Sequence, residues 1–335
     1  MLKIHITGGA GFIGLNLALY LQTRGYQVSA SDVRSRPQVL SAEIHYASAD
    51  LLDAEGLANL LADVRPDVVV HLGARTDLHG AGPADYAANT DGVRNLIAAC
   101  RCCPKLRRVL FASSRMVCRI DYVPTDFSDY CPPNAYGQSK VEAEQIVKTD
   151  NLGFEWSIFR PTSIWGPHFD IPYRTFFDQI RSGRYFHPGK FNPGKSFGYV
   201  GNSVFQIDKL IEAPADKVQG RTFYLGDYSP IHLREWADMI AAKSNPPRKI
   251  LTAPMLLLRA GARVGDLLSW AGMKDRFPLT TFRLNNLITD MIYPQLEDLE
   301  AITGALPYSL EAGTDATIKW LDMDCNRSRS TNILK

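Results

Sequence analysis

The sequence predicts an α/β fold in which a doubly wound parallel sheet is joined to a smaller α/β lobe. The first half alternates short apolar runs with longer segments of helical periodicity, which is typical of a parallel sheet covered by helices. A glycine-rich turn connects the first apolar run to the first helical segment. Beyond Gly166, prolines and glycines cluster and the predicted strands become short, which indicates a separate lobe.

The predicted strands are short runs rich in branched and aromatic residues. In chain order they cover residues 2–7, 27–31 with Asp32 at the end, 67–71, 108–112 and 156–159. Helices are expected over 12–23, 85–100 and 136–148, and the lobe adds a strand over 221–225 and a helix over 233–242. We therefore expect a domain over 1–166, to which some later segments could return, a substrate-binding lobe over 167–325 and a flexible tail over 326–335.

The composition argues against several classes of protein. Hydrophobic residues make up 45% of the chain and charged residues 21%, as in ordinary globular proteins. The net charge of +2 is too small to indicate nucleic acid or another polyanion as a partner. The six cysteines show no metal-finger spacing, so we expect reduced thiols and no metal site. The N-terminal segment does not read as a signal peptide, which favours a cytoplasmic protein.

Residues 254–273 form the longest apolar segment, but Arg259, Arg263 and Asp266 interrupt it. Stable insertion into a membrane is therefore not expected. An amphipathic helix packed on the body of the protein is the expected structure, and a helix lying on a membrane surface is the alternative.

The strongest local feature is the turn over residues 7–14, with the sequence TGGAGFIG. Gly8 permits a tight turn, Gly11 lets the backbone approach a pyrophosphate, and Gly14 allows the following helix to pack closely. The helix N-terminus offers free N–H groups and a positive dipole end to phosphates. This strand–turn–helix context predicts a Rossmann domain that binds a dinucleotide. The residues expected to contact it are Gly8, Gly11, Phe12, Ile13 and Gly14.

Asp32 ends the second predicted strand, where a carboxylate can accept hydrogen bonds from both hydroxyls of the adenosine ribose. The same carboxylate would repel a 2′-phosphate, which favours NAD over NADP. Arg34 and Arg36 keep NADP as the alternative, because arginine binds phosphate well. Asp50 and Leu51 are candidates for the adenine edge, although an acidic surface loop would look the same.

Tyr136 and Lys140 lie four residues apart, so a helix places them on one face. A free tyrosine, with a pKa of about 10, is a poor base at neutral pH. A nearby ammonium group favours the phenolate and brings that pKa toward the working range, so the pair could transfer protons. By itself this spacing is common, and a surface pair would show it too.

In combination with the other motifs, the chain resembles the extended short-chain dehydrogenases/reductases, and among them the nucleotide-sugar epimerases and dehydratases. The matching motifs follow the family's order and cover nearly the whole chain. They are residues 7–14, Asp32, Asp50-Leu51, His71-Leu72-Gly73-Ala74, Asn89-Thr90, Ser113-Ser114, Tyr136 with Lys140, Arg160-Pro161, 164–167, 195–200 and 223–227.

The resemblance implies roles for individual residues. Tyr136 would be the general base and acid at a sugar hydroxyl, Lys140 would tune it and bind the nicotinamide ribose, and Ser114 would align the hydroxyl. Lys195, in place of the family's usual arginine, would contact the substrate's diphosphate as a point charge. Arg115 would lie near the substrate. The further cofactor contacts implied are Arg34, Asp50, Leu51, Leu72, Gly73, Ala74, Asn89, Arg160, Pro161 and Ser163, with Asn89 mainly supporting the site.

The reaction implied first is epimerisation of a nucleotide sugar through a transient 4-keto sugar, with NAD taking up and returning the hydride. Arg115 and Met116 stand where the family's dehydratases have an acidic pair, so 4,6-dehydration lacks its acid and base. The alternative is a one-way dehydrogenase or keto-reductase that acts on a nucleotide sugar or a sterol-like 3β-hydroxy substrate. The Val-Gly-Asn sequence over 200–202 is more typical of the sterol 3β-hydroxy dehydrogenases than an Asp-Asp pair would be.

A non-catalytic regulator that senses NAD is a further alternative on the same fold. The presence of Tyr136, Lys140 and Ser114 counts against it. The resemblance also implies a homodimer, formed by a bundle of the helices over 85–100 and 136–148.

Overall fold

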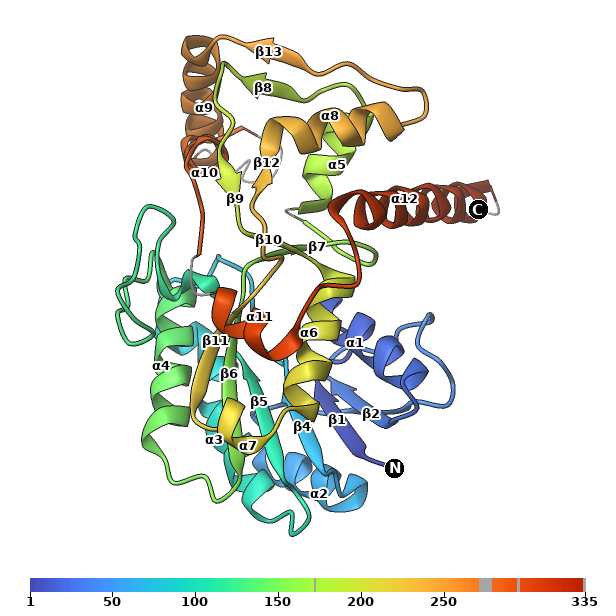
Figure 1. The fold of residues 1–335 in the computed structure, drawn as a ribbon, viewed down its shortest axis with the longest axis vertical. Helices are drawn as coiled ribbons and strands as arrows, with labels where there is room; N and C mark the ends of the chain where they lie inside the picture. Colours follow the sequence, from blue (N-terminus) through green and yellow to red (C-terminus); the bar gives the residue numbers. More distant parts are fainter. Residues whose placement is uncertain (172, 271–278, 294–295, 334–335) are drawn as a thin grey trace. The chain divides into compact units, whose positions relative to one another are not determined.

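The fold was obtained as a computed structural model, which describes residues 1–171, 173–270, 279–293 and 296–333, with side chains up to residue 324. The chain forms two compact units (Figure 1). Unit 1 comprises Met1–Ile164, Gly198–Tyr228 and Tyr293–Tyr308, and unit 2 comprises Trp165–Phe197, Ser229–Ile292 and Ser309–Lys335. The chain passes between the units within β7 (Ser163–Trp165) and β10 (Phe197–Tyr199).

Unit 1 is built on a seven-stranded sheet of order β11-β6-β5-β4-β1-β2-β3 in which all strand pairs are parallel. The strands are β1 (Lys3–Thr7), β2 (Gln27–Asp32), β3 (His45–Ser48), β4 (Val68–His71), β5 (Arg108–Ala112), β6 (Glu155–Pro161) and β11 (Arg221–Leu225). Because the strand order reverses between β1 and β4, the carboxyl ends of these two strands flank the position where open α/β sheets bind ligands.

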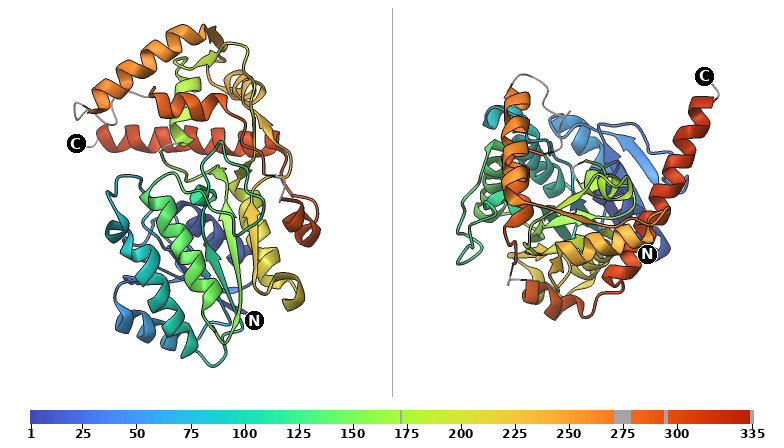
Figure 2. Two further views of the ribbon diagram at one scale, coloured as in Figure 1. Left: turned by 90° about the vertical axis from the view of Figure 1, so that its left-hand side faces the viewer. Right: turned by 90° about the horizontal axis from the view of Figure 1, so that it is seen from above.

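Helices cover both faces of this sheet, as Figures 1 and 2 show. Helices α2, α3 and α4 pack beside one another on one face, and α1 packs beside α6 on the other. The helical elements are α1 (Phe12–Thr23), α2 (Ala54–Val64), η1 (Pro83–Tyr86), α3 (Ala87–Arg101), η2 (Arg115–Val117), α4 (Ala135–Thr149), α6 (Val200–Glu212), α7 (Ala215–Val218) and α11 (Glu297–Thr303). Apolar side chains such as Val109, Phe111, Leu96 and Val147 fill the space between β5 and the α2–α4 layer.

Unit 2 is a smaller assembly of helices and two-stranded ribbons. Its elements are α5 (Tyr173–Arg181), β8 (Phe186–Pro188), β9 (Gly194–Lys195), β12 (Ile231–His232), α8 (Leu233–Lys243), β13 (Leu251–Ala253), α9 (Met255–Trp270), α10 (Thr281–Ile288) and α12 (Leu310–Ile333). Aromatic rings make up much of its core, with the Trp165 and Trp236 centroids 4.8 Å apart. The buried indole N–H of Trp236 donates to Thr314 Oγ1 at 3.1 Å.

The sequence-based assignment of elements is confirmed along most of unit 1, and residues 12–23, 108–112 and 221–225 have the predicted bounds. Helix α2 was not predicted. The placement of residues 221–225 in the lobe is wrong, because β11 pairs with β6 at the edge of the main sheet. Phe223, Tyr224 and Leu225 are fully buried there, so the apolar run that made this segment a strand also returns it to unit 1.

The flexible tail expected over 326–335 stays a prediction: α12 extends to Ile333, and residues 334 and 335 lie outside the described residues. This helix begins at Leu310 and buries Thr314, Thr317 and Leu321 in unit 2. Once a helix is nucleated by such packing, each further residue adds a hydrogen bond at little cost, so polar residues can extend it.

The apolar segment over 254–273 contains α9, an amphipathic helix that packs beside α10. Its buried face is made of small residues, Ala262 and Gly265. None of the helices in the part of the chain that the structure describes has the length and apolarity needed to cross a bilayer.

Candidate active site

The glycine turn after β1 has the geometry that its sequence predicts. Gly8 has a φ of +72°, and a Cβ on it would lie 2.6 Å from the backbone nitrogen of Gly73. A Cβ on Gly14 would lie 2.2 Å from the carbonyl oxygen of Gly8. Only glycine fits at either position, and the turn places the N-terminus of α1 at the carboxyl edge of the sheet.

Asp32 lies at the end of β2 beside this turn, and its carboxylate is buried. Its Oδ2 accepts from the backbone N–H of Ala10 at 3.1 Å, which ties the carboxylate to the glycine turn. Arg34 pairs with the same oxygen at 3.1 Å, and the Arg34 side chain is 60% exposed. The Arg34 Nε also donates to Oδ1 at 3.3 Å, so an exposed guanidinium lies over a buried carboxylate.

Helix α4 carries both members of the predicted proton-transfer pair. Asn134 caps the helix by accepting from the N–H of Gly137 at 2.9 Å, which places Tyr136 in the first turn. Tyr136 and Lys140 are both buried on the helix face that packs against the sheet. The Lys140 ammonium donates to the carbonyl of Ala112 at 3.1 Å, at the end of β5. The surface-pair interpretation is therefore wrong.

Burial lowers the pKa values of both Lys140 and His71, with opposite consequences for their charge near neutral pH. Burial lowers the pKa of Lys140 to about 8, against the opposing effect of Glu144. Burial, and then the charge of Lys140, lowers the pKa of His71 to about 3. His71 is therefore neutral, and its Nδ1 is hydrogen-bonded to Thr7 Oγ1 at 2.8 Å. This hydrogen bond links the ends of β4 and β1 directly beneath the glycine turn.

The segment that carries Ser114 lies close to the start of α4 through the backbone of Met116. Ser114 caps η2, with its Oγ accepting from the N–H of Met116 at 3.1 Å. A Cβ on Gly137 would lie 2.3 Å from the carbonyl oxygen of Met116. Glycine at 137 thus allows the segment that carries Ser114 to lie against the turn that carries Tyr136, a requirement that the sequence analysis did not identify.

The side-chain amide of Asn89 is hydrogen-bonded to other protein groups. Its Oδ1 accepts from the N–H of Arg75 at 2.8 Å, and its Nδ2 donates to the Arg75 carbonyl and to Ser139 Oγ at 3.0 and 2.9 Å. Asn89 is fully buried, so the amide is occupied by protein groups. It fixes the loop after β4 to α4. Tyr86, which the sequence analysis missed, packs its ring 6.0 Å from that of Tyr136.

The predicted cofactor contact of Arg160 is wrong, because its guanidinium is fully buried away from solvent. It forms two hydrogen bonds with the Glu144 carboxylate, at 2.7 and 2.8 Å, and donates to the carbonyl of Phe127 at 2.7 Å. The rings of Phe127, Tyr130 and Tyr224 surround it. Arg160 joins β6 to α4, and its complete burial keeps its N–H groups from a ligand.

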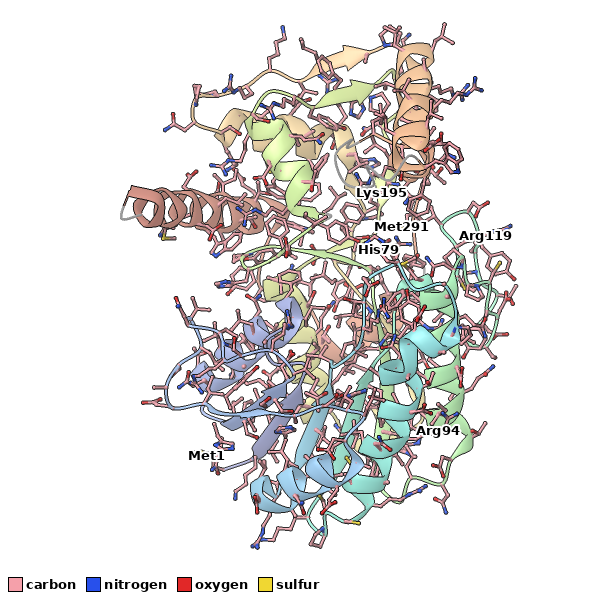
Figure 3. The ribbon with its side chains drawn as sticks, turned by 180° about the vertical axis from the view of Figure 1, so that it is seen from behind. Met1, His79, Arg94, Arg119, Lys195 and Met291 are labelled. Carbon is pink, nitrogen blue, oxygen red and sulfur yellow. The ribbon has the colours of Figure 1, made fainter. Side chains whose placement is uncertain are left out.

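The predicted contact of Lys195 with a substrate diphosphate is also wrong. Lys195 is 2% exposed, and in unit 2 its ammonium donates to the carbonyls of Asn286 and Thr289, at the end of α10. A lysine at a helix C-terminus satisfies carbonyls that have no partner within the helix. Figure 3 shows Lys195 beside Met291, with which it forms a β-bridge.

The other predicted contacts follow the carboxyl ends of the strands. Leu72, Gly73 and Ala74 follow β4, Arg115 lies in η2, and Ser163 is buried just after β6. Pro161 ends β6 and is half-buried. Leu51 contacts the position that a Cβ on Gly73 would take, and Asp50 is exposed and accepts from the N–H of Leu52 at 2.9 Å. The structure thus brings the glycine turn, Asp32, Ser114, Tyr136 and Lys140 to one edge of unit 1.

The cysteines in the described part, Cys100, Cys102, Cys103, Cys118 and Cys131, are free thiols. Burial raises the pKa of Cys100, which makes it a poor nucleophile. Among the residues that the structure describes, no group of three His, Cys, Asp or Glu side chains is placed to hold a metal ion.

Comparison with known proteins agrees with this geometry. A model of the NAD dependent epimerase/dehydratase family matches residues 4–226. A 2-alkyl-3-oxoalkanoate reductase of Stenotrophomonas maltophilia is 27% identical over 330 residues, which cover 93% of this chain and 97% of that protein. A 3 beta-hydroxysteroid dehydrogenase/Delta 5-->4-isomerase of Mycobacterium tuberculosis is 24% identical over 347 residues, covering 91% and 90%. The crystal structure of UDP-glucose 4-epimerase with UDP-glucose from Thermotoga maritima is similar in fold, with a TM-score of 0.73, 19% identity and coverage of 97% and 100%.

Proposed function

This chain belongs to the NAD-dependent epimerase/dehydratase family, and from this premise we propose that unit 1 binds NAD and catalyses hydride transfer at a substrate carbon that bears a hydroxyl. The observation that carries the proposal is the burial of Tyr136 and Lys140 on one face of α4, at the carboxyl edge of the sheet that also holds the glycine turn. NAD, when bound, supplies the acceptor and the donor of the hydride.

The residues of unit 1 fit this cofactor. The turn at Gly8 leaves no room for a Cβ, and the start of α1 provides N–H groups for a pyrophosphate. The Asp32 carboxylate, already fixed by Ala10, is placed to accept hydrogen bonds from a ribose diol once Arg34 moves aside. Asp32 and the glycine turn would hold the adenosine half, and Lys140 would hold the nicotinamide ribose.

The proton in this proposal moves through Tyr136. Its phenol takes the hydroxyl proton as the substrate is oxidised and returns it on reduction. Lys140, charged and buried nearby, favours the phenolate electrostatically, and Ser114 would hold the reacting oxygen. Because water is scarce around these buried groups, their charges act more strongly than at a surface.

The pH dependence of the reaction tests the role of Lys140. Its pKa is lowered to about 8, so in the free enzyme the ammonium loses its proton as pH rises through this value. We expect kcat/KM to fall on the alkaline side of about pH 8. Lys140→Arg keeps the charge at every working pH, so its profile should lack this decrease. A decrease at the same pH in both enzymes would show that another group causes it.

Asp32→Asn tests the adenosine site. Losing one charged hydrogen-bond partner should weaken NAD binding by about ten- to a hundredfold. Wild-type enzyme should bind NAD⁺ far more tightly than NADP⁺, and the variant should lose much of this preference. Calorimetric titration with each cofactor measures both effects, with Asp63→Asn, at an exposed position of α2, as the matched control. Equal affinity of the wild type for both cofactors would mean that Arg34 or Arg36 decides the preference.

For the overall reaction, epimerisation of a nucleotide sugar through a transient 4-keto sugar is the first candidate. The similarity in fold to an epimerase solved with UDP-glucose supports it. The burial of Lys195 removes one predicted diphosphate contact and so favours the second candidate, a one-way reduction or dehydrogenation, which is the type of reaction named for the two sequence relatives.

A substrate screen separates the two candidates. Purified enzyme is incubated with nucleotide sugars or with alkyl ketones and steroids, and products and NADH are both measured. Interconversion of two sugars without net NADH would establish epimerisation, whereas NADH formed or consumed in step with product would establish the one-way reaction.

A homodimer through α3 and α4 remains our proposal for the assembly, and gel filtration at micromolar concentration checks it.

A further inference from the structure

Helix α9 in unit 2 exposes an apolar face to solvent. Leu256 is 79% exposed, Leu257 65%, Val264 52%, Leu267 63% and Trp270 86%. The helix repeat places the first four within about a third of the circumference, opposite the small residues that pack the helix onto unit 2. Contiguous exposed apolar residues of this size are uncommon on a monomer and indicate an interaction surface.

The ribbon of β8 and β13, which leads directly into α9, extends this apolar surface. Phe186 and Leu251 are paired in register on adjacent strands, and about half of each side chain is exposed. Phe191, just beyond β8, is also exposed. In Figure 1, β13 runs toward the start of α9, so the ribbon and the helix form one continuous feature. We call α9 together with this ribbon the α9 surface.

Basic residues outnumber acidic ones along the α9 surface and the segments that flank its strands, and Asp266 near the end of α9 is the acidic residue of the helix. Residues 179–197 and 239–265 contain no Asp or Glu. Six basic residues in these stretches are exposed, and none of them forms an ion pair with any residue that the structure describes. They are Arg184, Lys190, Arg248, Lys249, Arg259 and Arg263. The Asp266 carboxylate accepts from the backbone N–H of Thr281 at 3.0 Å.

This pattern reflects a division of charge between the units that the net charge of +2 conceals. Unit 2 has 18 Lys and Arg against 11 Asp and Glu, whereas unit 1 has 19 against 24. Unit 2 is therefore positive by seven charges and unit 1 negative by five. The positive unit is the one that exposes the apolar helix.

We propose that the α9 surface binds the surface of an anionic lipid bilayer, with α9 lying in the interface. Aliphatic and aromatic side chains would enter the boundary between headgroups and acyl chains, while the six basic residues contact anionic headgroups. A second copy of this chain is a poorer occupant, because pairing two such surfaces would bring together twelve positive charges that have no ion-pair partner among the described residues. Nucleic acid would use the charges but would leave the leucines exposed.

Co-sedimentation with vesicles tests the proposal on the full chain. The probes are vesicles of phosphatidylcholine mixed with phosphatidylglycerol and vesicles of phosphatidylcholine alone. We expect binding to the anionic vesicles, much weaker binding to the neutral ones, and release from the anionic vesicles by added salt. Absence of binding to the anionic vesicles would overturn the proposal.

Two pairs of substitutions examine the two halves of the surface. Leu256→Gln with Leu267→Gln keeps helix propensity, removes apolar area, and should weaken binding at least tenfold. Arg259→Gln with Arg263→Gln should weaken binding to anionic vesicles by roughly fivefold for each charge and reduce its salt dependence. Circular dichroism and NAD titration verify that each variant is folded.

The matched control is Val39→Gln with Val123→Gln, which changes exposed apolar residues of unit 1 and should leave vesicle binding unchanged. Equal losses in the control and the α9 variant would show a nonspecific effect and overturn the assignment. Gel filtration of the wild type and the leucine variant without lipid tests whether the α9 surface is instead a contact between copies of the chain. If wild-type protein ignores vesicles and the leucine change instead dissociates an oligomer, the α9 surface is a contact between copies and the proposal is wrong.

Discussion

Replacing Tyr136 by phenylalanine is expected to lower turnover by about 10²–10⁴ while leaving the fold and NAD binding intact. The substitution preserves the ring that packs beside Tyr86 and removes only the hydroxyl. In the proposed mechanism no other group takes the substrate's proton. Lys140 donates to the carbonyl of Ala112, and its role in the proposal is to favour the phenolate of Tyr136.

The measurement combines circular dichroism, NAD titration and turnover on the substrate that the screen identifies. Tyr122→Phe is the matched control, because it removes a phenol hydroxyl from the same unit that is bonded to Asp129. The control should retain most of its turnover. A folded Tyr136→Phe enzyme that binds NAD and turns over at nearly the wild-type rate would remove the catalytic assignment and leave only the dinucleotide-binding domain.

The sequence was sufficient to predict most of unit 1 because its patterns are local. Strands that are buried on both faces are continuous apolar runs. The glycine turn requires glycine at fixed positions, because a Cβ on Gly14 would lie 2.2 Å from the carbonyl oxygen of Gly8. The return of residues 221–225 to the main sheet could not be derived in this way. Pairing between β11 and β6 is a long-range contact, and periodicity does not specify the partner of a strand.

Among the predicted site residues, too, local patterns were informative and long-range contacts could not be predicted. The four-residue spacing of Tyr136 and Lys140 predicted a shared helix face, and the order of the other motifs along the chain singled out this pair. Arg160 and Lys195 were mispredicted because the positive charge of a side chain says nothing about its partner. Each is buried against oxygen atoms from distant parts of the chain, the Glu144 carboxylate in one case and the α10 carbonyls in the other.

The buried cluster around Glu144 has its own consequence for stability. Glu144 is 1% exposed and its carboxylate accepts from Arg160, from Lys148 at 3.2 Å and from Tyr130 at 2.9 Å. Burial raises the pKa of Glu144, but the hydrogen bonds and charge of Arg160 outweigh this and hold it below the usual range. The carboxylate is therefore ionised and neutralises a guanidinium that has no access to solvent.

Glu144→Ala should lower the free energy of unfolding by about 3–5 kcal/mol, because it leaves the Arg160 charge buried without a partner. Urea denaturation followed by circular dichroism measures the change. Glu142→Ala on the same helix is the matched control. Glu142 lies in an exposed pair with Arg94 at 3.5 Å, so its loss should cost no more than about 1 kcal/mol.

Two further measurements test whether the ion pair between Glu144 and Arg160 causes this loss of stability. They are the free energy of unfolding at low pH and the effect of a double substitution. Because the folded-state pKa of Glu144 is lowered, its contribution is present above the unfolded-state value of about 4.3 and is lost as pH falls through the lower folded-state value. The stability difference between wild type and Glu144→Ala should therefore shrink in acid.

Glu144→Met combined with Arg160→Met removes both charges, and it should cost less than the sum of the single changes. If the double variant is as unstable as that sum, the cluster stabilises unit 1 through packing of its side chains, and the paired charge has no separate role.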